Sequence, residues 1–153
     1  MLNDPRMTNS SFIEGYSADG SLHYAPYTND PRVSHAHGWS TGPTSLMSFY
    51  VAGIHLMGSM GRTWRISPMM GDLTEVDAGF ETPLGSFSNS IKAEGTNGTV
   101  TQMQFSTPKG TTGSVFLPGV VGKLVCNGGP SVNLFSGEAT GLQGGDWTLQ
   151  VQG

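Results

Sequence analysis

The chain has few charged residues for its length. Asp, Glu, Lys and Arg make up 12% of its 153 residues, about half the share that is usual in globular proteins. Seven basic and eleven acidic side chains give a net charge of −4 and an isoelectric point near 5.4. Because this composition leaves no basic surface to neutralise phosphates, we expect neither nucleic acid nor a membrane surface as a partner.

Cysteine is almost absent. The single Cys126 excludes an intrachain disulfide framework and a cysteine-based zinc site. It ends the run Lys123-Leu124-Val125-Cys126, which is typical of a strand, and there a lone cysteine packs as a small apolar residue.

Nucleotide-binding motifs and targeting segments are missing as well. There is no Gly-x-x-x-x-Gly-Lys-Ser/Thr loop and no Gly-x-Gly-x-x-Gly run, so we expect no cofactor. No apolar run is long enough for a membrane helix. Met1–Arg6 lacks the basic and apolar regions of a signal peptide, and the sequence leaves the compartment open.

Glycine and neutral polar residues are abundant instead. The 23 glycines are about twice the usual share, and Ser, Thr, Asn and Gln fill much of the remaining polar composition. A neutral polar surface suits sugar ligands or a secreted protein. A chain of this length can bury about 70% of its unfolded surface, so a real core is possible.

From about Arg62 the hydrophobic pattern has a period of two, with glycine-containing turns between short runs. These runs are Thr63–Ile66, Thr99–Phe105, Gly113–Leu117, Lys123–Cys126, Ser131–Phe135 and Trp147–Val151. The pattern predicts a mainly β protein, an antiparallel β-sandwich of about seven or eight strands.

One helix is expected before the strands. Pro43 and Thr44 provide start signals, Ser45–Met57 is apolar nearly all round, and Gly58 provides a stop signal. A helix without a polar face must be buried. We therefore expect two regions, a loop-rich segment with one buried helix over residues 1–60 and a C-terminal sandwich over residues 61–153.

The loop-rich segment contains the residues most suited to chemistry. Glu14 lies among apolar and aromatic neighbours with no adjacent Lys or Arg, a setting in which desolvation favours a general base or acid. The alternative for Glu14 is a solvated loop carboxylate. His35 and His37 could contact a sugar or be structural, and we expect no metal site, since their spacing alone does not specify one. Tyr16 and Trp39 offer aromatic faces to a sugar ring or to the core.

Five segments of the chain resemble a known protein family. These segments are Phe12–Tyr16, Asn29–Thr44, Trp64–Pro68, Gly71–Leu73 and Gly110–Gly113. With these segments the chain resembles the carboxy-terminal part of fungal-type α-L-rhamnosidases and their relatives among the six-hairpin glycosidases. The resemblance extends over nearly the whole chain.

The resemblance implies an (α/α)6 barrel with an inverting active site and a β-sandwich behind it. Glu14 matches the general base that activates water, and His37 or His35 matches a sugar-contacting histidine beside Trp39 and Tyr16. The implied substrate is a terminal rhamnose in a glycoside, and the implied parent enzyme is secreted.

The chain departs from the family in lacking most of the barrel. An inverting glycosidase needs a second carboxyl group as its general acid, about 6.5–9.5 Å from the base. The family's acid lies upstream on barrel helices, so we expect this chain to be an incomplete rhamnosidase, a fragment that keeps the base. Its partners would then be the missing barrel portion or another copy of the chain. The alternative is a non-catalytic sandwich that binds carbohydrate or docks a partner.

Overall fold

A computed structural model describes residues 13–15, 17–21 and 37–152. It divides the chain into two compact units, Met1–Ser45 and Leu46–Gly153. The expected assignment of residues 1–60 to an (α/α)6 barrel remains a prediction. The region before the sandwich contains a helical run, made of η2 (Gly38–Thr41), α1 (Gly42–Leu46) and the π-helical turn η3 (Met47–Val51).

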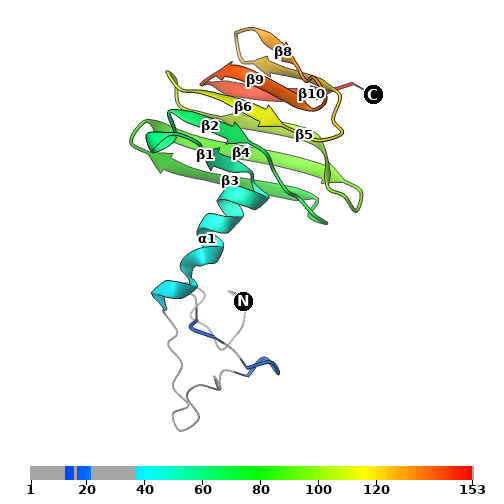
Figure 1. Ribbon diagram of the computed structural model, residues 1–153. Coiled ribbons are helices and arrows are strands. Elements are labelled where there is room, and N and C mark those ends of the chain that lie inside the picture. Colours follow the sequence, from blue (N-terminus) through cyan, green and yellow to red (C-terminus); the bar gives the residue numbers. More distant parts are fainter. Residues whose placement is uncertain (1–12, 16, 22–36, 153) are drawn as a thin grey trace. The chain divides into compact units, whose positions relative to one another are not determined.

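The second unit is a β-sandwich, which confirms the expected fold class (Figure 1). Its described strands are β1 (Ile54–Leu56), β2 (Thr63–Ile66), β3 (Glu75–Thr82), β4 (Gly85–Glu94), β5 (Thr99–Ser106), β6 (Thr112–Phe116), β7 (Gly122–Cys126), β8 (Ser131–Asn133), β9 (Glu138–Gln143) and β10 (Asp146–Val151). One sheet has the order β1-β2-β6-β9, and the other has the order β3-β4-β5-β10-β7-β8. A short 3-10 turn, η4 (Ser59–Gly61), joins β1 to β2. Neighbouring strands are antiparallel except β2 and β6, which are parallel.

The two sheets enclose one hydrophobic core. The four-stranded sheet contributes Trp64, Ile66 and Val115, and the six-stranded sheet contributes Phe87 and Met103, all at most 1% exposed. The buried indole of Trp64 donates from Nε1 to Thr111 Oγ1 at 2.9 Å, and Thr111 in turn donates to the carbonyl of Pro108 at 2.6 Å. The Trp64 indole N–H and the Thr111 hydroxyl therefore both have hydrogen-bond partners, so neither is a buried polar group without a partner.

The expected strands after Arg62 are all present, with ends that shift by one or two residues. The structure adds β1, β3, β4 and β9. The hairpin of β3 and β4 was not predicted. Its exposed face is rich in Ser, Asp and Glu, and Asn89 takes one of its buried positions, so the apolar alternation of a strand is weak there. The alternation of Phe87, Ile91 and Ala93 with polar residues was the signal for this hairpin.

The expected helix over Ser45–Met57 is wrong in both length and burial. The helical run ends at Val51, and Ile54–Leu56 continues as a strand that pairs with β2. Leu46, Met47 and Tyr50 are about half exposed, at 50%, 53% and 51%. Only one side of the run packs inward, where the Phe49 ring meets Phe80 of β3 edge-on at 6.1 Å.

Gly53 explains why the helix stops. Its φ is +70°, and a Cβ there would lie 2.2 Å from the backbone nitrogen of Pro68. Only glycine combines the left-handed conformation with so close an approach. Asn89 secures the same junction, because its Nδ2 donates to the Ala52 carbonyl at 2.8 Å from a fully buried position.

Candidate functional site

Glu14 follows a buried residue in a short bent segment. Ile13 is 2% exposed and anchors the segment, while the Glu14 side chain is 15% exposed. The carboxylate is thus largely shielded from water but still accessible. A carboxylate in this setting can accept a proton from a bound water or a sugar hydroxyl.

A tight turn follows Glu14 along the chain. Gly20 takes φ +80°, and its N–H donates to the Ser17 carbonyl at 2.9 Å. The Asp19 carboxylate accepts a hydrogen bond from the Ser21 N–H at 2.9 Å. This hydrogen bond holds the pKa of Asp19 below its ordinary value of 3.8, because it favours the charged form.

His37 stands at the start of the helical run. Its backbone is extended and precedes η2, in which Thr41 Oγ1 donates back to the Gly38 carbonyl at 2.7 Å. The backbone of Gly42 is already helical, and Pro43 after it suits the first turn of a helix. The His37 side chain is 31% exposed, so the start of the helix presents an imidazole that is partly open to solvent.

The structure brings Glu14 and His37 together. Glu14 Oε2 lies 4.0 Å from His37 Nδ1, although the two residues are 23 positions apart in the sequence. At this distance the groups form an ion pair when the imidazole is protonated, and both can reach a small molecule between them. The arrangement combines a proton acceptor with a donor to a sugar hydroxyl.

A second concave region lies on the exposed face of the six-stranded sheet. It is an open cavity of about 1020 Å³, lined by residues of β3, β4, β5, β10 and β7. Sequence reasoning missed it because strand register, not sequence proximity, brings these residues together. Its only sequence signal is the polar set at the alternate, outward positions of the strands.

The family of the chain can be identified from the sandwich. A scan against protein-family models matches residues 53–129 to the bacterial alpha-L-rhamnosidase C-terminal domain, just over half of the chain. The matched segment runs from the Gly53 junction through β7. The chain belongs to this family.

The match places the rhamnosidase C-terminal domain in the sandwich and leaves Glu14 and His37 before it. None of the curated proteins compared with this rhamnosidase domain matches it. The general expectation of a rhamnosidase C-terminal part is therefore confirmed. The fungal-type and six-hairpin affiliations and the site residues remain predictions.

The other expected site residues of this rhamnosidase chain are less completely described. Trp39 belongs to the η2 backbone, while Tyr16 and His35 lie outside the described residues. Among the described residues of the first unit, Asp19 has the only other carboxyl group. Its lowered pKa keeps it ionised near neutral pH, which is the wrong state for a proton donor.

The residues directly after His37 contain one further motif. Gly38-Trp39-Ser40-Thr41-Gly42 has the Gly-x-Ser-x-Gly spacing of a serine-hydrolase nucleophile turn. That chemistry needs the serine on a sharp turn between a strand and a helix. Here Ser40 lies within a 3-10 helix, so it is not on the strand-to-helix turn that a nucleophilic serine of this kind requires.

In the described part of the chain, no three His, Cys, Asp or Glu side chains gather as metal ligands would. None of its helices has the length and apolar character needed to cross a membrane.

Proposed function

We propose that this chain is the C-terminal portion of an inverting α-L-rhamnosidase, a six-hairpin glycosidase with fungal-type relatives, in which Glu14 is the general base. The observation that carries the proposal is the shielded Glu14 carboxylate 4.0 Å from His37 in a chain whose sandwich belongs to the rhamnosidase family. The substrate is a glycoside with a terminal rhamnose.

In the proposed reaction, Glu14 takes a proton from a water molecule as that water attacks the anomeric carbon. A new carbon–oxygen bond forms on one face of the sugar while the glycosidic bond breaks on the other, which inverts the configuration. His37 holds a rhamnose hydroxyl, and His35, Trp39 and Tyr16 complete the sugar contacts.

The leaving oxygen needs a proton from a general acid. Asp19 does not suit this role, because its hydrogen bond from Ser21 stabilises the ionised form. We therefore assign the acid to a carboxyl group outside the described residues, in the remaining portion of the barrel. Removing a general base costs about 10²–10⁴ in rate, and the acid contributes separately.

The proposed partner covers the helical run. Leu46, Met47 and Tyr50 expose apolar surface within five residues of one another. Exposed apolar clusters on a soluble domain mark interaction sites. We propose that the remaining barrel portion, or a second copy of the chain, packs there. The alternative function, a non-catalytic module that docks a partner, rests on the same surface.

Hydrolysis of an aryl α-L-rhamnoside by this chain combined with the remaining barrel portion, which supplies the general acid, tests the catalytic proposal. We expect Glu14→Gln to lower kcat by about 10²–10⁴, while Asp19→Asn, the matched change at the neighbouring carboxylate, leaves it near wild type. Proton NMR of the first product should show the β-anomer. Full activity in Glu14→Gln, or a first product that is the α-anomer, would contradict the proposal.

A further inference from the structure

The exposed face of the six-stranded sheet contains a hollow formed by residues of the second unit, whereas Glu14 and His37 belong to the first unit. Strand register places Asp77 opposite Ser90, Ser90 opposite Gln104, and Gln104 opposite Thr148. Val125 of β7 continues the row opposite Thr148. All these side chains point away from the core, since their neighbours along each strand are buried or face the core.

A second row lies beside the first. Gly79, Ser88, Ser106 and Asp146 face one another across β3, β4, β5 and β10. Glycine and serine are short, so the sheet surface is low in this row, and the longer side chain of Gln104 rises beside it. The hollow extends from Asp77 to Asp146, three strand spacings or about 14 Å.

The side chains that line the hollow indicate which class of molecule it can bind. Hydroxyl and amide groups dominate, two carboxylates accept hydrogen bonds, and no Lys or Arg belongs to the lining. Phosphates and other anions would meet Asp77 and Asp146 without a compensating cation. Apolar atoms, including those of Val125, contribute more of the exposed lining than polar atoms do, which provides a surface for the ring faces of a sugar between the polar groups. A neutral molecule rich in hydroxyl groups can pair with every kind of polar group present.

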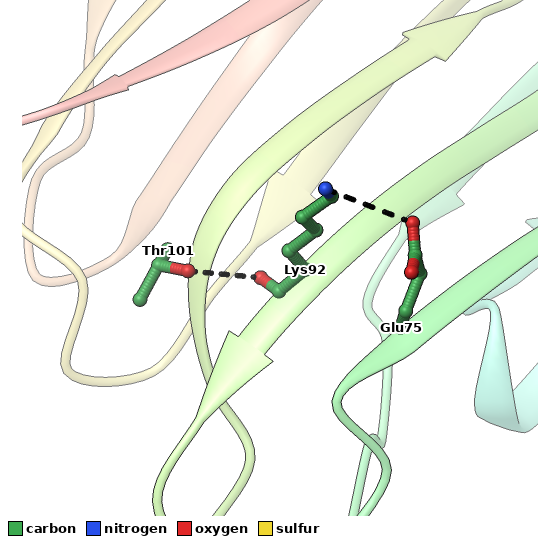
Figure 2. A network of polar contacts seen from close by, with 3 residues as sticks. All are labelled: Glu75, Lys92 and Thr101. Carbon is green, nitrogen blue, oxygen red and sulfur yellow. Dashed lines mark hydrogen bonds and ion pairs between the residues drawn. The ribbon is translucent and has the colours of Figure 1, made fainter.

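Two lysines lie at the edge of the hollow on this face. Lys123 of β7 lies opposite Gln150 of β10, and Lys92 of β4 is paired with Glu75. Lys92 lies in the row next to Asp77 and Ser90, and its Nζ is 3.8 Å from Glu75 Oε1 on β3 (Figure 2). The Lys92 carbonyl also accepts a hydrogen bond from Thr101 Oγ1 at 3.4 Å (Figure 2). The hollow therefore has the two carboxylates of Asp77 and Asp146 in its lining, and the lysines on this face lie at its edge.

We propose that this hollow is a binding site for a neutral oligosaccharide, separate from the Glu14–His37 site. The sugar chain lies across β4, β5 and β10. Its hydroxyls exchange hydrogen bonds with Ser90, Gln104 and Thr148, and a ring face packs on Val125. The cavity, at about 1020 Å³, is at the upper end of the range for small-molecule sites, about 300–1,000 Å³, which favours an oligosaccharide over a monosaccharide.

Amide NMR of the full chain, titrated with a linear α-L-rhamnan oligosaccharide and separately with maltohexaose, tests this site. We expect saturable shifts at Ser90, Gln104 and Thr148 with at least one of the two probes. Gln104→Ala should weaken binding about tenfold, the effect of losing side-chain hydrogen bonds. Thr148→Ala, on the adjacent strand, should weaken it similarly.

Gln102→Ala is the matched control, because Gln102 is exposed on the same face of β5 but outside the lining. It should leave the affinity unchanged. Glu14→Gln should also leave it unchanged, which separates this site from the catalytic proposal. The absence of shifts on this face with both probes at millimolar concentration would overturn the proposal, as would equal weakening by Gln102→Ala or binding of heparin alone.

Discussion

At the scale of single residues, side chains with the same chemistry have different roles because their surroundings differ. Glu14 is shielded and lies near an imidazole, whereas Asp19 is exposed and is held by the Ser21 N–H. The first setting suits proton transfer with a ligand. The second fixes a turn and keeps the carboxylate ionised.

The hydrogen bond at Asp19 predicts its titration. We expect its pKa to be lower than the ordinary value of 3.8. A depressed pKa in the folded state means that the stabilisation is fully present above the unfolded value, and that it is lost as the pH falls through the folded one. Carbon-detected NMR of the carboxyl group measures this midpoint.

Asp19→Ala provides the control for that titration. The Ser21 amide resonance should move toward its value in an unstructured peptide and lose its dependence on acidic pH. A midpoint at or above 3.8 in the wild type would contradict the role of this hydrogen bond.

At the scale of elements, the junction between helix and strand depends on Gly53. The residue lies between η3, which packs through Phe49 on β3, and β1, which joins β2. Substitution there alters two elements at once, because the helix end and the strand start share this one backbone conformation.

Gly53→Ala should destabilise the sandwich by about 3 kcal/mol or more, since left-handed strain and a backbone clash add. Gly71→Ala is the matched control. Gly71 also has a positive φ, +57°, but a Cβ there would meet nothing within 4 Å, so only strain of about 1–2 kcal/mol remains. Urea unfolding measures both, and equal losses would contradict the clash.

Across the whole molecule, the buried apolar side chains and the exposed apolar side chains of the helical run lie in different parts of the chain. The hydrophobic cluster runs from Ala52 to Leu149 and closes within the second unit. Leu46, Met47 and Tyr50 precede that cluster and face solvent. The sandwich therefore supplies its own stability, and the helical run is left to interact with something else.

Sedimentation tests whether a second copy covers this surface. We expect the chain to sediment above its monomer mass of 16.1 kDa at micromolar concentration, and Tyr50→Glu to return it to the monomer. Phe135→Glu, at a site that is 76% exposed near β8, is the control and should not change the mass. A wild type that stays monomeric at all concentrations counts against self-association.

The sandwich and the candidate site residues could be predicted from local features of the sequence. Alternation of polar and apolar residues is local, and it identified six strands, while residue chemistry singled out Glu14 and His37. The end of the helix at Gly53 could not be predicted in this way, since the reason is the approach of Pro68 from the segment after β2. The tertiary structure alone placed Glu14 against His37 and aligned Asp77, Ser90, Gln104 and Thr148 across four strands. Strand register and close backbone contacts bring together residues that are far apart in the chain, so no local sequence pattern predicts these contacts.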